Sequence, residues 1–257
     1  MIRTAQHSDR GHVRQVNEDS VWIGSIQQEY TLGIVADGMG GHRAGDTASQ
    51  LAVQTIIGDL QGLEAGLSLE ACRAALHDAI LHANNVVFHT AQMDDSYHNM
   101  GTTVVAVLLR GNSGIIGHIG DSRAYLVGEE ALRLLTQDHT LVNELLKNHQ
   151  ITQEEAAVHP RRNVLTRALG TDAEVVVEID DIQLKVGEVL LLCSDGLTNM
   201  IGNQQIETVA LAGIALEERA KHLVALALEA GGEDNITVAL FEMDDSTVEL
   251  STKGWEQ

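Results

Sequence analysis

The pattern of apolar and polar residues divides the first third of the chain into short strands followed by two long helices. Strands are predicted over 2–8, 20–26 and 31–36, and the last of these is apolar throughout, as in a buried strand. Apolar residues then recur at helical spacing over 46–60 and again over 68–90. The pattern therefore predicts three strands followed by a helical hairpin.

The rest of the chain returns to strands and ends with a second pair of helices. A polar loop over 92–100 precedes strand patterns that are separated by turn signals such as Arg-Gly-Asn and Gly-Asp-Ser. These strands are predicted over 102–109, 113–119, 123–128, 131–136, 174–182, 188–194 and 236–243. Between them lie an irregular segment with short helices over 139–169, and helices near 203–212 and 216–230.

Strands and helices that occur in groups, rather than in alternation, indicate antiparallel sheets. We therefore predict an α+β fold, in which each of two stacked sheets is covered on its outer face by one helical pair. The 257 residues contain one proline and no internal repeat or shift in composition. One domain is expected over 1–245, and a polar tail over 246–257.

The charge balance limits the classes of partner. With 16 basic and 37 acidic residues the formal net charge is −21, which repels phosphate backbones and excludes nucleic acid as a partner. No signal peptide precedes the first strand, and no apolar run reaches the length of a membrane span. Two cysteines without disulfide or zinc spacing fit a reducing compartment, so the cytoplasm is expected.

Acidic residues stand at the ends of apolar runs in four separate segments. Asp37, Asp121 and Asp195 each follow such a run directly, and Asp234 lies just before one. A desolvated carboxylate is costly unless a cation or several hydrogen-bond donors meet it. Oxygen ligands gathered at one sheet edge are what hard divalent cations prefer. The pattern thus points to a divalent metal site.

Each acid also has an ordinary local explanation, because Asp-Gly and Gly-Asp-Ser are common turn sequences. Asp234 could likewise cap nearby amides in a loop. The turn interpretation is weaker for Asp37 and Asp195, because the next predicted element after each of them is a helix rather than a second strand. Gly38 also allows its carbonyl to approach a cation closely. Together, the four acids favour a metal site more strongly than any one of them does alone.

Other polar residues near these acids are candidates for a site. Arg14 could hold a phosphate with its planar guanidinium, or lie solvated on the surface. Glu18 and Asp19 could reach cations or their waters, or form a charged turn. His42, five residues after Asp37, is a candidate proton donor. The spacings of phosphate-binding loops, serine nucleophile elbows and reactive cysteines are missing from the sequence.

Eight segments in this order closely resemble the metal-dependent protein phosphatases of the 2C type, in particular the bacterial single-domain members. They cover about residues 3–241 and read RGHVRQVNEDS, VADGMGGHRAGDTAS, GTTVVAVLL, HIGDSRAYL, LTQDHT, HPRRNVLTRALG, LLCSDGLTNM and EDNITV. The resemblance implies a four-layer αββα sandwich of two antiparallel sheets flanked by paired helices. It also implies two Mn²⁺ or Mg²⁺ ions at the sheet edge, and a flap over about 143–170 beside the channel.

The resemblance assigns metal ligands by position. Asp37 would bridge both metals, and the Gly38 carbonyl would bind one of them. Asp195 and Asp234 would hold the other metal, and Asp121 together with Asp195 would form a third, weaker site.

The same resemblance assigns the remaining roles. Arg14 matches the phosphate-binding arginine, and Glu18 and Asp19 would act as a ligand or through ordered waters. Animal members have His directly after the Asp-Gly pair, where this chain has Met39. In bacterial members His42 is the candidate replacement as general acid.

The implied reaction is hydrolysis of phosphoserine and phosphothreonine monoesters in proteins. A water or hydroxide between the two metals would attack phosphorus without a covalent enzyme intermediate. The expected partners are phosphorylated proteins and, by analogy, a eukaryotic-like Ser/Thr kinase, and the chain is expected to be a monomer. Two rivals remain: a hydrolase of small phosphate esters, and a degenerate relative that binds phosphoproteins without turnover.

Overall fold

Two antiparallel sheets pack face to face in the structure, a computed structural model that describes residues 2–40, 44–128 and 131–243. The first sheet has the order β1 (Ile2–Asp9), β11 (Ile236–Met243), β10 (Val189–Cys193), β7 (Arg123–Val127), β8 (Leu132–Leu134). The second has the order β2 (Asp19–Ile26), β3 (Tyr30–Met39), β5 (Val104–Arg110), β6 (Ser113–Ile119), β9 (Glu178–Gln183), and the short β4 (Gly101–Thr102) pairs with β3.

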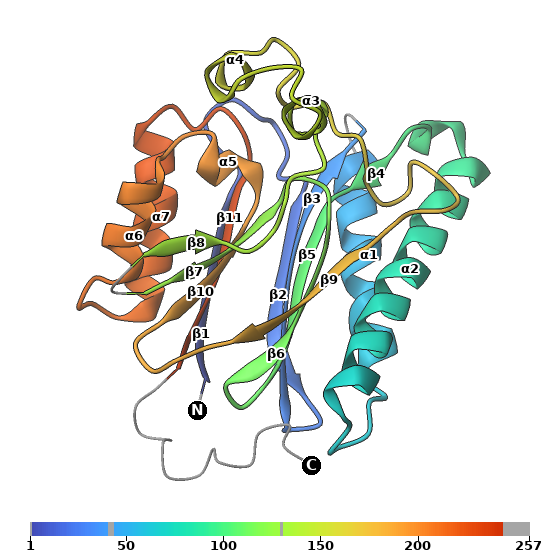
Figure 1. The fold of residues 1–257 in the computed structure, drawn as a ribbon. Helices are drawn as coiled ribbons and strands as arrows, with labels where there is room; N and C mark the ends of the chain where they lie inside the picture. The colour runs from blue at the N-terminus through green and yellow to red at the C-terminus, as the bar shows by residue number, and fades with distance from the viewer. Residues whose placement is uncertain (1, 41–43, 129–130, 244–257) are drawn as a thin grey trace.

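Helical pairs cover the outer faces of both sheets (Figure 1). Helices α1 (Ala44–Leu60) and α2 (Leu69–Met93) pack on the second sheet, and α6 (Asn203–Ala210) and α7 (Leu216–Glu229) on the first. The four-layer αββα sandwich predicted from the sequence is confirmed.

The core is layered because side chains alternate between the two faces of a strand. Val35 and Val107 of one sheet and Leu192 of the other are buried in the layer between the sheets. Their neighbours face outwards: Ile34 packs towards α1 and α2, and Leu191 towards α6 and α7. Continuous apolar runs along these strands therefore follow from burial on both faces.

Short elements account for most differences from the sequence prediction. The strand predicted over 174–182 begins only at β9, because residue 174 lies in a bend and 175–177 are irregular. The strand predicted over 102–109 divides at Thr103, whose N–H donates to the Asp37 carbonyl at 2.9 Å. The predicted loop over 92–100 contains the 3₁₀ helix η1 (Asp95–Tyr97).

Three short helices lie at one end of the sandwich (Figure 1). They are α3 (Leu141–Lys147), α4 (Gln153–Ala157) and α5 (Asp195–Thr198). The first two belong to the segment that was predicted to be irregular with short helices. Within the described ranges, no helix combines the length and apolar character needed to cross a membrane. The predicted tail over 246–257 lies outside the described residues.

Candidate metal centre

Strand pairing brings the predicted acids together from distant parts of the chain. Asp19 at the start of β2 is the cross-strand partner of Asp37 near the end of β3. On the facing sheet, Asp195 follows β10 and Asp234 precedes β11, and these two strands are paired. Asp121 lies in the turn between β6 and β7. All five carboxylates therefore lie at one end of the sandwich.

A cavity of about 380 Å³ lies between these sheet ends. Every predicted metal ligand lines it, together with the predicted phosphate-binding residue, namely Arg14, Glu18, Asp37, Gly38, Asp121, Asp195 and Asp234. Asp19 lies behind this lining, where its Oδ2 accepts a hydrogen bond from Ser194 Oγ at 2.8 Å. His42 lies outside the described residues, so its role as general acid stays a prediction.

Two carboxylate oxygens of this cluster are buried without a hydrogen-bond partner. They are Glu18 Oε1 and Asp19 Oδ1, and within the described part of the chain no other buried side-chain nitrogen or oxygen is in this state. Leaving such an atom unpaired is costly. Because the cavity is lined by carboxylates together with Gly38, the donor set fits a hard divalent cation such as Mg²⁺ or Mn²⁺.

The electrostatics of the cluster also favour a cation. Burial, and then repulsion from Asp19, Asp195, Asp121 and Asp234, raise the pKa of Asp37 well above its ordinary value. Burial raises the pKa of Asp19 to about 7 and that of Asp121 to about 8. Without positive charge in the cavity, these carboxyl groups therefore still bind protons near neutral pH.

Arg14 supplies positive charge at the mouth of the cavity. Its Nη2 lies 2.7 Å from Asp234 Oδ2, and its Nη1 lies 3.9 Å from Glu18 Oε2. About half of its side chain remains exposed, at 47%. The guanidinium is therefore held beside the acids while part of its donor set can reach a ligand.

The close approach of α1 to β3 explains why Gly38 carries no side chain. A Cβ at this position would lie 2.1 Å from the Gly45 carbonyl oxygen and 2.7 Å from that of Glu18. The Gly38 N–H also donates to the Glu18 carbonyl at 3.2 Å. The start of α1 and the Glu18 backbone thus pack directly against Gly38, the residue that follows Asp37.

Three polar residues that sequence reasoning did not assign to the site hold its frame in place. Asn235 accepts from the Glu18 N–H at 2.8 Å, and its amide donates to two carbonyls of the segment 10–16. Thr103 Oγ1 accepts from the Asp37 N–H at 3.1 Å and lies 2.6 Å from Ser122 Oγ. The string Glu-Asp-Asn before the last strand was the available signal for Asn235.

A second cluster of titratable residues lies outside the acid cavity. The ring nitrogens of His118 and His139 and the Glu178 carboxylate offer ligand atoms within 4.8 Å of one another. Arg167 Nη1 lies 3.5 Å from Glu178 Oε1, and each histidine already has polar partners. The nearby guanidinium disfavours a further cation, so we interpret this cluster as a hydrogen-bonded group.

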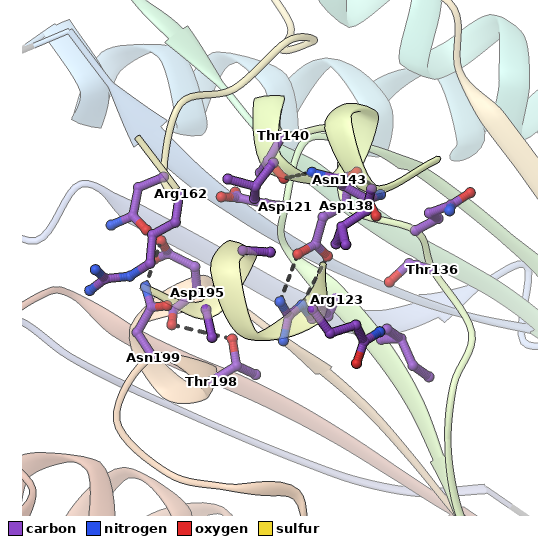
Figure 2. A pocket seen from close by; sticks show the side chains of 18 of the residues that line it. Asp121, Arg123, Thr136, Asp138, Thr140, Asn143, Arg162, Asp195, Thr198 and Asn199 are labelled. Carbon is purple, nitrogen blue, oxygen red and sulfur yellow. Dashed lines mark hydrogen bonds and ion pairs between the residues drawn. The ribbon is translucent and has the colours of Figure 1, made fainter. Parts of the chain in front are cut away.

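A larger cavity of about 740 Å³ adjoins the acids under α3 and α4 and shares Asp121 and Asp195 with the metal centre. Figure 2 shows Arg123 and Asp138 on one side of it and Asp195 with Asn199 on the other. Arg123 binds Asp138 through two hydrogen bonds of 2.9 and 2.6 Å. The Asn199 amide donates to Asp195 Oδ2 at 3.0 Å, which fixes one oxygen of that carboxylate.

The chain is similar in sequence to known protein phosphatases. The family model of protein phosphatase 2C matches residues 5–228. The serine/threonine phosphatase Stp of Listeria monocytogenes is 40% identical over 237 residues, which cover 92% of this chain and 94% of that protein.

The chain is also similar to solved phosphatase structures. The serine/threonine phosphatase of S. agalactiae superposes with a TM-score of 0.90 at 38% identity, covering 95% of this chain and all of that one. The catalytic domain of the phosphatase PstP, solved with two manganese ions, has a TM-score of 0.82 at 36% identity and covers 94% of this chain and 97% of its own. The resemblance inferred from the motifs is confirmed, and the chain belongs to the protein phosphatase 2C family.

Proposed function

We propose that this metal-dependent protein serine/threonine phosphatase hydrolyses phosphomonoesters in the cavity formed by Asp37 and its neighbouring acids. The observation that carries the proposal is the convergence of six carboxylates, Glu18 among them, two of which leave a buried oxygen without a partner. Asp37, the Gly38 carbonyl, Asp195 and Asp234 would hold two Mn²⁺ or Mg²⁺ ions. Asp121 together with Asp195 would hold a third, and Glu18 would contribute directly or through water.

When bound, divalent cations would lower the pKa of a water and offset charge on the phosphoryl group. The remaining chemistry belongs to side chains of this chain. Asp19, whose Oδ1 has no partner, is available to accept a hydrogen bond from a water at the back of the cavity. Arg14 extends from its contact with Asp234 to bind phosphoryl oxygens with its free donors. His42 remains the proposed donor of a proton to the departing serine or threonine oxygen.

Attack by water, rather than by the protein, fits the lining of the cavity. Among the described lining residues, Thr103 carries the one hydroxyl, and none is cysteine. That hydroxyl is buried and bonded to the Asp37 N–H and to Ser122 Oγ. No side chain of this set is therefore placed as a nucleophile, and a covalent intermediate is not required.

Phosphorylated proteins are the substrates that follow from this activity. The proposal further includes a eukaryotic-like Ser/Thr kinase as functional partner, a monomeric chain and a cytoplasmic location. It also includes the catalytic domain over 1–245 and a flap over about 143–170. Asn163 and Leu165 of that segment line the metal cavity, which supports its role beside the channel.

A substrate comparison with metal titration tests this function. Purified chain with Mn²⁺ is expected to release phosphate from phosphoserine and phosphothreonine peptides faster than from nucleotides or sugar phosphates, and chelator should stop the release. A preference for small esters would favour the rival hydrolase. No release from any substrate, with or without Mn²⁺, would favour a phosphoprotein-binding relative.

Replacing Arg14 with alanine is expected to weaken substrate binding more than turnover. Because the guanidinium offers paired donors to phosphate, we expect the Michaelis constant for a phosphopeptide to rise about tenfold. Arg14→Lys keeps the charge but loses the planar geometry, so it should recover only part of the loss. Initial rates over a range of peptide concentrations measure this. A Michaelis constant and rate equal to wild type would remove Arg14 from the site.

A further inference from the structure

The turn that carries Asp121 is held by one residue from a different part of the chain, His139. The Gly120 N–H donates to His139 Nδ1 at 3.0 Å, and the His139 N–H donates to the Gly120 carbonyl at 2.9 Å. The His139 side chain is almost fully buried, at 2% exposure. His139 therefore fixes both the N–H and the carbonyl of Gly120.

The turn that carries Asp121 has little conformational freedom. Gly120 has a φ of +104°, and a Cβ there would lie 2.5 Å from the Thr103 side chain. Thr103 in turn contacts Ser122 and the Asp37 N–H. The Asp121 turn thus sits between Thr103, which holds Asp37, and His139.

The hydrogen bonds of His139 define its tautomer. Because Nδ1 accepts from a backbone N–H, the ring proton resides on Nε2, which lies 3.0 Å from Glu178 Oε1. Glu178 thereby keeps the lone pair of Nδ1 directed at Gly120. His118 stacks on the ring with an interplanar angle of 7° and a centroid distance of 5.0 Å, which restricts rotation of the ring.

From this geometry we infer that His139, oriented by Glu178, is the positioning residue for Asp121 in the metal centre. The inference rests on the proposed function, in which Asp121 is a metal ligand. Partners that hold ligands from behind typically change metal affinity or activity by about 10- to 100-fold when removed. Loss of the Gly120 contact should therefore raise the Mn²⁺ requirement and leave phosphopeptide binding largely intact.

Two substitutions at position 139 separate the contacts of the ring. In His139→Asn the Oδ1 replaces Nδ1 as acceptor for Gly120, and the contact with Glu178 is lost. In His139→Gln the amide replaces Nε2 as partner of Glu178, and the acceptor for Gly120 is lost. We expect the Mn²⁺ concentration for half-maximal activity to rise about tenfold in His139→Gln and clearly less in His139→Asn. His82→Gln is the control, because His82 is an exposed histidine on α2 that contacts Asp59 and not the Asp121 turn.

A readout in the metal-free protein tests the contact itself. In NMR spectra the Gly120 amide proton should shift upfield and exchange faster in His139→Gln, and remain near its wild-type state in His82→Gln. The double variant Asp121→Asn/His139→Gln should need no more Mn²⁺ than Asp121→Asn alone, since His139 acts through Asp121.

The outcomes distinguish this inference from the proposed function. If wild type hydrolyses phosphopeptides with Mn²⁺ but His139→Gln has the same Mn²⁺ requirement and Gly120 resonance, His139 is not the positioning residue. Additive effects in the double variant would contradict it too, because they would mean that His139 acts elsewhere. If wild type shows no Mn²⁺-dependent hydrolysis, the proposed function itself fails, and the Gly120 resonance alone reports on the contact.

Discussion

Replacing Asp37 with asparagine is expected to lower phosphatase turnover by about 10³-fold or more and to stabilise the metal-free fold. Asparagine keeps the shape of the side chain but removes a charge that four neighbouring acids repel. Activity falls because the proposed ligand of both metals is lost. Stability without metal rises because a buried, uncompensated charge is removed. Turnover with saturating Mn²⁺ and thermal melting in chelator measure the two effects.

The opposite direction of these two effects makes the test specific. A substitution that merely damaged the fold would lower both activity and melting temperature. Asp78→Asn is a suitable control, because Asp78 is an exposed acid on α2, with 79% of its side chain accessible. That variant should match wild type in both measurements. Normal turnover in Asp37→Asn would show that Asp37 is not a metal ligand.

In the metal-free protein, the free energy of unfolding is expected to fall as pH rises. A carboxyl whose pKa is raised in the folded state contributes stability that is complete below its unfolded value and lost as pH rises through the folded value. For Asp19 and Asp121 this window extends from the ordinary 3.8 to about 7 and about 8. The melting temperature of chelator-treated protein should therefore be higher near about pH 5 than near about pH 8.

Mn²⁺ should reverse this loss most strongly at the higher pH, where protons no longer compete for the carboxylates. At a free concentration about 100 times its dissociation constant, a bound ion contributes about 2.7 kcal/mol, which is roughly 5–10 °C for a chain of this size. Calorimetry with and without Mn²⁺ at both pH values measures the effect. The stability of the metal-free protein could instead rise over this window, or the Mn²⁺ effect could be independent of pH. Either result would contradict the repulsion inferred among the buried carboxylates of the cavity.

The convergence of the candidate ligands on one cavity could be predicted from the sequence because its signal is local. Asp37, Asp121 and Asp195 follow apolar runs that indicate buried strands. The free-energy cost of burying a carboxylate at these positions can therefore be inferred from the sequence. The ordered motifs added the roles proposed for Arg14 and Gly38. The fold was likewise predictable, since strand alternation and helical periodicity are properties of short windows.

The contacts that position these candidate ligands could not be predicted, because they join residues far apart in the chain. Asn235 holds Glu18 across 217 positions, and Arg14 meets Asp234 across 220. His139 was one polar residue in an irregular segment, and nothing near it in the sequence indicates Gly120 as its partner.

In the proposed function, acids from three separated segments, Asp37, Asp195 and Asp234, bind a shared pair of divalent ions. Direct counting of Mn²⁺ bound at equilibrium, by electron paramagnetic resonance of the free ion, tests it without an activity assay. We predict at least two ions per wild-type chain, and at most one in both Asp37→Asn and Asp195→Asn. Wild type that binds no Mn²⁺, or variants that bind as many ions as wild type, would contradict the claim.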